Sequence, residues 1–235
     1  MARSNEEWAR NIISRFDPSF QPRWEVFDTF VGELTDPSKR CLNIGSGVHE
    51  DPEFNFKFRL NLDVDILYPA VAAQRQIPFV QSDLYSLPFR DESFDIVLLR
   101  FVVEHLENPQ RAFQEIGRVL TGEGKVLIIT TNLKSPFIWL AKLLPFGLRK
   151  FIMKYIYGVA DEDVFPTYHR LNSRRRVKKL EPYFRLHRWQ YLQDANWNRR
   201  WLFVLLFAFH LKTKWLGLHV LRSNFIAILE KSNVS

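Results

Sequence analysis

The sequence predicts an α/β fold built on a mostly parallel sheet with helices on both faces. Two observations predict it. Short apolar runs of strand length alternate with amphipathic helical segments through residues 40–131, as in parallel sheets that are covered on both sides. A strand, a Gly-x-Gly turn, a second strand and acidic residues follow one another between Cys41 and Asp65, the order typical of a nucleotide-binding crossover. A chain of 235 residues is long enough for one such domain with insertions.

The front half supplies three helices and five strands of this fold. Apolar spacing predicts helices over residues 5–16, with Asn5 as the N-cap, and over 22–34. Another amphipathic helix is predicted over 108–120. The predicted strands are Cys41–Ile44, Leu60–Val64, Pro78–Val80, Phe94–Leu99 and Lys125–Thr130. About a dozen residues separate the first two strands, too few for a long crossover helix, so we expect a shortened first helix, no more than a loop or a single turn.

The back half is apolar, aromatic and basic. A capped helix over 170–184 should lead into a strand over 183–192, and residues 223–232 should form a short final strand. The remaining segments read as helical, basic insertions on the same sheet. Residues 1–131 hold 14 Lys/Arg and 20 Asp/Glu, whereas residues 132–235 hold 19 and 6. The basic half should therefore face an anionic partner, or else form a merely solvated basic surface.

Several functional classes are disfavoured by the sequence. With Cys41 as the single cysteine, no disulfide framework can form within one chain, and a reducing, cytoplasmic compartment is expected. The polar N-terminus does not resemble a secretory signal, and no uncharged apolar run approaches the ~20 residues of a membrane span. The six histidines show no metal-ligand spacing, so no metal site is predicted.

Four signals fall at the carboxyl ends of predicted strands, where open parallel sheets bind ligands. These are Gly45-Ser46-Gly47, then Asp63, then Asp83, and finally Arg100-Phe101 with Glu104-His105. Missing side chains at the glycines let a ligand approach the backbone, and carboxylates accept hydrogen bonds from ribose hydroxyls or an adenine amine. Each signal has a plainer explanation: Gly-x-Gly commonly marks a tight turn, and a single Asp can cap a helix or a turn. Their joint placement favours a cofactor site.

These motifs resemble a class I S-adenosylmethionine-dependent methyltransferase of the type 11 group. The resemblance rests on "LNIGSG", "NLDVD", "SDLYSLPFRDESFDIVL" and "VVEHLENPQRAFQEIGRVLTGEGKVLI" in combination, and "NFIAILEK" resembles the last strand of the family. It implies a Rossmann-like sheet of seven strands, with the last one antiparallel. It also implies one domain: N-terminal helices (1–38), a cofactor-binding core (39–131), acceptor-pocket or lid insertions (132–222), and a last strand with a tail (223–235).

The resemblance implies that S-adenosylmethionine is the cofactor. The first glycine turn would hold its methionine part, Asp63 its ribose, and Asp83 with Leu84 its adenine. The residues that the resemblance places around the cofactor are Asn43, Gly45, Ser46, Gly47, Asp63, Asp83, Leu84, Arg100 and Phe101. The chain departs from the family at Asn43, where an acid is usual, and at His49, where a glycine is usual. Asn43 accepts hydrogen bonds but adds no negative charge to pair with the ammonium of the cofactor.

Methyl transfer from a sulfonium is a displacement in which positioning supplies much of the rate. A general base is needed only when the acceptor arrives protonated. Glu104 and His105 lie where a base is expected, although a pair that packs and caps a helix start explains them equally well. Tyr168 and His169, in the variable region that usually forms the acceptor pocket, are further candidates. Relatives that hold a metal here need an extra acid where this chain has Phe101, which again predicts no metal.

The basic half sets the expectations for partners. Arg174, Arg175 and Arg176 occupy a predicted first helical turn, where positive charge opposes the helix dipole. Residues 137–157 and 201–215 mix aromatic, aliphatic and basic residues as interfacial helices do, although an ordinary helical cover has the same composition. We therefore expect a small or lipid-linked acceptor and contact with an anionic membrane surface, and rank both above nucleic acid. The alternative is an inactive cofactor-binding scaffold. No pattern indicates an oligomeric state.

Overall fold

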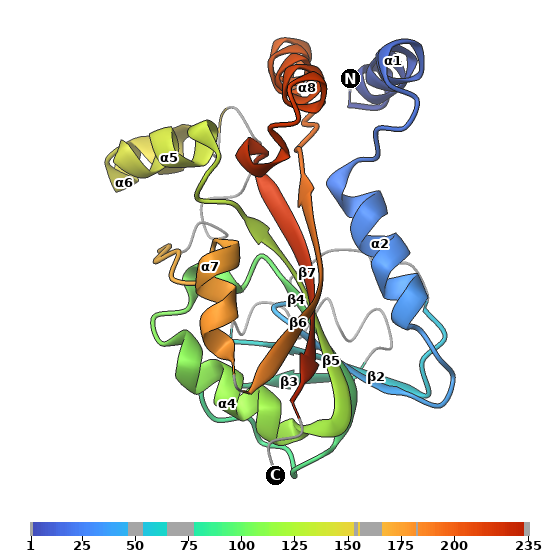
Figure 1. The fold of residues 1–235 in the computed structure, drawn as a ribbon, viewed down its shortest axis with the longest axis vertical. Helices are drawn as coiled ribbons and strands as arrows, with labels where there is room; N and C mark the ends of the chain where they lie inside the picture. Colours follow the sequence, from blue (N-terminus) through green and yellow to red (C-terminus); the bar gives the residue numbers. More distant parts are fainter. Residues whose placement is uncertain are drawn as a thin grey trace. The chain divides into compact units, whose positions relative to one another are not determined.

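The computed structural model describes residues 2–46, 54–64, 78–152, 155, 166–181 and 183–232. Seven strands form one sheet in the order β3-β2-β1-β4-β5-β7-β6 (Figure 1). They are β1 (Arg40–Ile44), β2 (Phe58–Asp63), β3 (Phe79–Gln81), β4 (Phe94–Arg100), β5 (Leu120–Thr131), β6 (Phe184–Leu192) and β7 (Asn224–Lys231). The helices are α1 (Ala2–Phe16), α2 (Arg23–Leu34), α4 (Pro109–Val119), α5 (Pro136–Leu143), α6 (Phe146–Ile152), α7 (Arg174–Val177) and α8 (Arg200–Trp215). Short 3-10 turns cover Val103–His105, Lys178–Leu180 and His219–Leu221.

The contacts divide the chain into two compact units. The first consists of Met1–Val26, Thr131–Pro166 and Tyr191–Phe225, and the second of Phe27–Thr130, Thr167–Gln190 and Ile226–Ser235. Most of the sheet and helix α4 belong to the second unit, whereas α1, α5, α6 and α8 belong to the first. The expected division at residues 38, 131 and 222 stays a prediction.

The predicted mostly parallel sheet is confirmed. β1 pairs in parallel with β2 and β4, β2 with β3, and β4 with β5. β7 runs antiparallel to its neighbours β5 and β6, as its arrow in Figure 1 shows. Two hydrogen bonds place the carboxyl end of β7 beside the start of each of these strands. The backbone amide of Ser232 donates to the Tyr183 carbonyl beside β6, and Lys231 Nζ donates to the Leu120 carbonyl of β5. The sheet is therefore mixed, with β7 as the reversed strand.

Apolar side chains explain why these segments form a covered sheet. Four consecutive residues of β1 and almost all of β4 are buried, as strands covered on both faces require. Helix α4 buries Ala112, Phe113, Ile116 and Val119, and the ring of Phe113 meets that of Phe184 on β6 at 5.6 Å. Residues 27–34 of α2 lie on the opposite face from α4 (Figure 1). Asn108 caps α4 by accepting a hydrogen bond from the Arg111 amide at 3.2 Å.

Three expectations about local structure were wrong. Helix α1 begins at Ala2, so Asn5 lies within it and bonds to the Asn198 carbonyl and Arg200 rather than capping. Strand β5 begins at Leu120 rather than 125, because the chain pairs with Phe94 directly after α4 and continues past a register shift. The helix expected over 170–184 is reduced to α7 and a 3-10 turn. The first crossover, with Gly47 and His49, lies largely outside the described residues.

In the first unit, helices α1 and α8 pack through aromatic side chains. Trp8 of α1 contacts Phe203 of α8 with ring centroids 5.6 Å apart, and Phe20 contacts Phe207 at 5.4 Å. Both Phe203 and Phe207 are buried, together with Ala9, Ile13 and Ala195. Helix α5, in contrast, buries none of its residues. Within the described ranges, no helix combines the length and the apolar character that crossing a bilayer requires.

Candidate cofactor and catalytic site

The carboxyl ends of β1, β2, β3 and β4 are aligned at one edge of the sheet. Ile44 at the end of β1 is in register with Leu62 on β2 and Leu99 on β4, and Asp63 at the end of β2 is in register with Gln81 on β3. The loops that follow are tied across the strands. The Gly45 amide donates to the Leu62 carbonyl at 2.8 Å, and the Ser82 amide donates to the Asp63 carbonyl at 3.0 Å. The structure therefore brings the predicted cofactor residues Gly45, Asp63 and Asp83 to one edge.

Gly45 has a structural reason to be glycine. Its φ is +66°, a left-handed conformation that side chains disfavour, and a Cβ added there would overlap Cγ2 of Val102. The turn after β1 is thus held against the turn after β4, where Phe101 also has a positive φ of 54°. A non-glycine residue in that conformation stores strain, and such residues cluster at functional sites. Ser46 is buried beside this turn, and Gly47 lies outside the described residues.

Asn43 lies in the interior of the sheet. It is fully buried, and its Nδ2 donates to Oδ1 of Asn61 on β2 at 3.1 Å. An acid at position 43 would accept hydrogen bonds and could not make this donation. The amide that replaces the usual acid therefore links β1 to β2, and its contact with a cofactor stays a prediction.

The two candidate carboxylates differ in exposure. Asp63 is buried, with 9% of its surface exposed, whereas Asp83 is exposed. One oxygen of Asp83 accepts a hydrogen bond from the Tyr85 amide at 2.9 Å, which fixes the turn after β3. Leu84 is buried in the core, and its contact with a cofactor stays a prediction. Both carboxylates can accept hydrogen bonds of the kind that ribose hydroxyls and an adenine amine donate.

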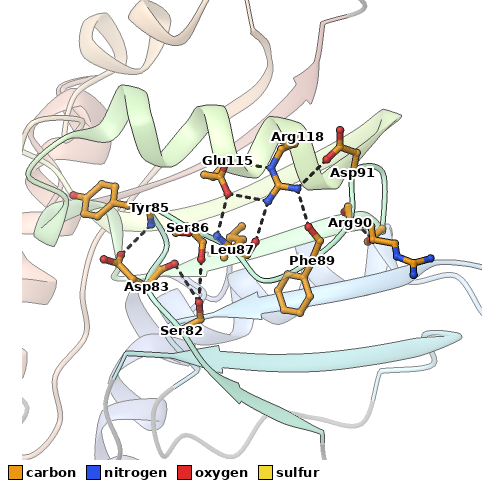
Figure 2. Close-up of polar contacts among 11 residues, drawn as sticks. Ser82, Asp83, Tyr85, Ser86, Leu87, Phe89, Arg90, Asp91, Glu115 and Arg118 are labelled. Atoms are coloured by element: carbon orange, nitrogen blue, oxygen red, sulfur yellow. Dashed lines mark hydrogen bonds and ion pairs between the residues drawn. The ribbon is translucent and has the colours of Figure 1, made fainter.

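The loop that carries Asp83 is clamped by α4. Figure 2 shows the guanidinium of Arg118 donating to the carbonyls of Leu87 and Phe89 at 2.9 and 2.7 Å. The same group forms ion pairs with Glu115 and Asp91 at 2.8 and 2.9 Å, and these bonds raise the pKa of Arg118. The Leu87 amide donates in turn to Glu115. Arg118 and Glu115, which sequence reasoning missed, thus hold the segment "LPFRD" in place.

Tyr85 joins this loop to the start of α4. Its hydroxyl accepts hydrogen bonds from the backbone amides of Glu107 and Asn108 at 2.9 and 3.1 Å. The loops after β3 and β4 are consequently connected through one side chain.

Arg100, at the end of β4, is buried and places its guanidinium 4.8 Å from the ring centroid of Phe27.

A chain of buried polar groups runs inward from Glu104. Its Oε2 accepts a hydrogen bond from the Thr130 hydroxyl at 2.6 Å, and Nδ2 of Asn172 donates to the same hydroxyl oxygen at 2.8 Å. Glu104, Thr130 and Asn172 are at most 3% exposed. The carboxylate of Glu104 is thus engaged by the end of β5, a contact between residues 26 positions apart that no local motif could have revealed.

The backbone of Glu104 brings the other catalytic candidates together. Its carbonyl accepts hydrogen bonds from the amides of Tyr168 and His169 at 2.8 and 3.0 Å. Tyr168 is 41% exposed and His169 is buried, with a positive φ of 52°. His105 follows Glu104 in the same 3-10 turn and is half-buried. The structure therefore gathers all four predicted catalytic residues around one turn.

Two further expectations concern metals and anions. Over the described ranges, no group of three or more His, Cys, Asp or Glu side chains is placed to hold a metal ion. Arg174, Arg175 and Arg176 are exposed on the one-turn helix α7, and Arg176 donates to the His169 carbonyl. Because α7 has only four residues, the expected unfavourable interaction with a helix dipole has little basis.

Comparison with known proteins supports the class of the domain. Residues 60–128 match the family described as a methyltransferase domain. An uncharacterized protein of Methanocaldococcus jannaschii is 34% identical over 92 residues, which cover 39% of this chain and 44% of that protein. A demethylmenaquinone methyltransferase of Lactobacillus johnsonii is 39% identical over 59 residues, 25% of this chain and 24% of that protein. The chain thus matches less than half the length of these curated relatives.

Solved structures agree in fold. A SAM-dependent methyltransferase from Methanosarcina mazei has a TM-score of 0.56 at 15% identity, covering 86% of this chain and 97% of that one. The cyclase SpnF has a TM-score of 0.55 at 19% identity, covering 87% and 79%. Such likenesses establish the fold and leave the reaction open.

Residues 60–128 thus match a methyltransferase-domain family, and the chain has the fold of a solved S-adenosylmethionine-dependent methyltransferase. S-adenosylmethionine is the methyl donor that this family implies. The residues at the sheet edge fit it. Two carboxylates at adjacent strand ends, Asp63 and Asp83, suit hydroxyl and amine donors and would repel a pyrophosphate, which S-adenosylmethionine lacks.

Proposed function

We propose that this protein transfers a methyl group from S-adenosylmethionine to a small or lipid-linked acceptor. The observation that carries the proposal is the alignment of Gly45, Asp63 and Asp83 at adjacent strand ends, in a chain whose residues 60–128 match a methyltransferase domain. Asp63 would accept hydrogen bonds from the ribose hydroxyls, and Asp83 from the adenine amine. Leu84 would contact the adenine as well, and the turn at Gly45–Gly47 would hold the methionine part of the cofactor.

When bound, the cofactor supplies an electrophilic methyl group on a sulfonium. The chain contributes orientation and, for a protonated acceptor, a base. Glu104 is poorly suited to that role because its carboxylate is buried and accepts the Thr130 hydroxyl. His105, on the same turn, and Tyr168, 41% exposed, are better placed to meet an acceptor. We therefore assign the base to His105, with Tyr168 as a hydrogen-bonding group.

The acceptor is proposed to be apolar and to be met at an anionic membrane surface. Two features support this. Helices α5 and α8 carry exposed aromatic and aliphatic residues beside lysines, and a matched stretch of 59 residues resembles a demethylmenaquinone methyltransferase. Because that stretch covers only 24% of the relative, it supports a class of acceptor, lipid-like and ring-bearing, and no particular molecule.

Calorimetry tests the cofactor first. S-adenosylmethionine should bind with micromolar-range affinity, roughly −8 kcal/mol. Asp63→Ala should weaken binding by about 1.5–3 kcal/mol for each charge-assisted hydrogen bond lost, and Asp83→Ala should weaken it as well. Glu123→Ala is the matched control, because this exposed carboxylate lies near the start of β5 and outside the loop that carries Asp83. Absence of binding to the wild type, or unchanged binding in both site variants, would contradict the proposal.

A catalytically inactive cofactor-binding scaffold is the second candidate. It is favoured by Asn43, which is fully buried and hydrogen-bonded to Asn61 where the family usually has an acid. The scaffold would bind S-adenosylmethionine but leave it intact. Mass spectrometry of an extract incubated with a labelled methyl donor separates the two: label should appear in a small or lipid-linked product with the wild type, and the scaffold would give none.

A further inference from the structure

Helix α8 is apolar on both sides, although only one side is covered within its unit. One stripe consists of Leu202, Phe203, Leu206 and Phe207, all at most 4% exposed, and its two phenylalanines belong to the buried cluster that includes Ala9 and Ile13 of α1. The opposite stripe recurs every three or four residues, at Trp201, Val204, Leu205 and Ala208, and reaches Lys212 and Trp215. Of these, Trp201 is 58%, Leu205 48% and Trp215 85% exposed. A surface helix normally carries polar residues on such a face, so this one should have a partner.

The helix pair α5 and α6 extends the exposed apolar surface. Trp139, Leu140 and Leu143 of α5 are each at least 58% exposed, and Phe151 of α6 is 56% exposed. Two contacts connect the segment from α5 to Tyr155 with α8 and the residue before it. The ring of Phe137 meets that of Phe209 at 4.8 Å, and the guanidinium of Arg199 donates to the Tyr155 carbonyl at 3.3 Å. We call the exposed residues of α5, α6 and the outer stripe of α8 the apolar basic surface.

Charge indicates what covers this surface. Residues 132–160 and 195–229 contain no Asp or Glu, whereas Lys142 and Lys212 project among the apolar residues and are exposed. Within the described ranges, neither lysine forms an ion pair. A second copy of the chain would bring like charges together, which costs free energy. An anionic bilayer supplies both an apolar layer and opposite charge.

The two tryptophans fit the same partner. Trp201 and Trp215 lie at opposite ends of the outer stripe, 14 residues or roughly 21 Å apart along the helix axis. Tryptophan favours the headgroup level of a bilayer, because its ring is apolar and its N–H is polar. A helix lying in the plane of the interface would place both rings at that depth, with Val204 and Leu205 reaching the acyl chains between them.

We propose that α8, with α5 and α6, docks on an anionic lipid bilayer through the apolar basic surface. This inference rests on the proposed function, which it deepens by naming the surface that brings the domain to an acceptor held in a membrane. Salt weakens the attraction of the lysines, whereas apolar insertion is not screened. Docking should therefore have one salt-sensitive part and one salt-resistant part.

Sedimentation with phosphatidylcholine vesicles, with or without phosphatidylglycerol, tests the docking. The wild type should sediment with the anionic vesicles, partly so at high salt. Lys212→Gln should lower the partition coefficient about fivefold on anionic vesicles only. Trp201→Gln combined with Leu205→Gln should lower it about tenfold or more, at high salt as well. The matched controls are Lys57→Gln and Phe58→Gln, an exposed basic and an exposed apolar residue at the start of β2. Both should sediment like the wild type.

Three outcomes would overturn the inference. The first is that the wild type does not bind vesicles, and the second is that the α8 variants and the control variants lose vesicle binding equally. The third is that sedimentation velocity shows a stable dimer that Leu205→Gln dissociates. Calorimetry with S-adenosylmethionine on the same variants separates this inference from the proposed function. Vesicle binding without cofactor binding would support membrane docking and contradict the methyltransferase activity. Cofactor binding without vesicle binding would contradict membrane docking and leave the methyltransferase activity standing. Circular dichroism checks that each variant is folded.

Discussion

His210 of α8 and Asp17, in the turn after α1, form a buried pair with Nε2 and Oδ2 2.8 Å apart. The residues are 193 positions apart in the sequence, and both are at most 5% exposed. The other oxygen of Asp17 accepts hydrogen bonds from Lys214 Nζ at 2.7 Å and from the Ser19 hydroxyl at 2.6 Å. An ionised carboxylate can only accept, so Nε2 of His210 carries the proton. The pair fixes α8, and with it the apolar basic surface, against the end of α1.

The stability of the protein should fall on the acid side of neutrality. Burial lowers the pKa of His210 from its ordinary value of 6.5, against the opposing hydrogen bond to Asp17. In the pH range just below 6.5, the unfolded chain is therefore protonated at His210 whereas the folded chain is not. The free energy of unfolding consequently declines as pH falls below about 6.5, by at most about 1.4 kcal/mol per pH unit. Urea unfolding between about pH 8 and about pH 5 measures this slope.

Asp17 should add a second loss at lower pH. Burial alone would raise the pKa of Asp17, but hydrogen bonds from Lys214, Ser19 and His210 outweigh it, and the pKa is lowered. Its contribution is present above the ordinary Asp value and is lost as pH falls through the folded value. His210→Gln should remove the first stage of the decline and keep the second. His187→Gln, a change at an exposed histidine, is the control. An unchanged slope in His210→Gln would show that another group titrates.

Gly45→Ala should destabilise the fold through two separable effects. The positive φ of Gly45 costs an alanine about 1–2 kcal/mol, and the overlap with Val102 Cγ2 should add about 1–3 kcal/mol. Val102→Ala removes the atom that is overlapped. In the double variant, the loss in free energy of unfolding should be smaller than the sum of the two single losses, while the backbone cost remains. Additive losses in urea unfolding would mean that the two residues are not in contact.

Arg118→Ala should loosen the loop that carries Asp83. The change removes two hydrogen bonds to backbone carbonyls and two ion pairs, so backbone amides of residues 82–91 should exchange hydrogen faster. Cofactor affinity should fall about tenfold, because binding must then order the loop. Gln114→Ala, an exposed position on the same helix, should change neither. Hydrogen-exchange mass spectrometry and calorimetry give the two readings, and a local loss of protection with unchanged affinity would remove Asp83 from the cofactor site.

His105 and Glu104 should respond differently to conservative substitution. His105→Gln should lower kcat by about 10²–10⁴ if it is the base, while cofactor affinity stays constant. Glu104→Gln keeps the size of the side chain, retains an acceptor for Thr130 and removes the charge. Its main effect should be on stability, measured by thermal unfolding, because the group is buried against Thr130. If activity is lost in Glu104→Gln and kept in His105→Gln, the two roles are reversed.

The sequence alone determined the sheet and the edge at which the candidate cofactor residues lie. Apolar runs in β1, β2 and β4 and the turn residues after them are local signals, since burial on both faces requires continuous apolar strands. The ends at Gly45, Asp63 and Asp83 were therefore predictable, as was α4 from its apolar stripe. Element boundaries were less so: β5 begins at Leu120 because pairing with Phe94 extends the strand into the turn, and pairing is not local.

Only the tertiary structure decided which side chains meet. Asp17 and His210, Glu104 with Thr130 and Asn172, and Arg118 with the loop after β3 join residues between 26 and 193 positions apart. No periodicity records such pairs, because a buried polar group is satisfied by whatever partner the packing of helices and strands brings within reach. The sequence likewise indicated apolar, basic helices in the back half. Packing decided that α8 buries Phe203 and Phe207 against α1 and leaves Trp201, Leu205 and Trp215 exposed, because the neighbours that cover one side of a helix are brought there by the fold and not by the local sequence.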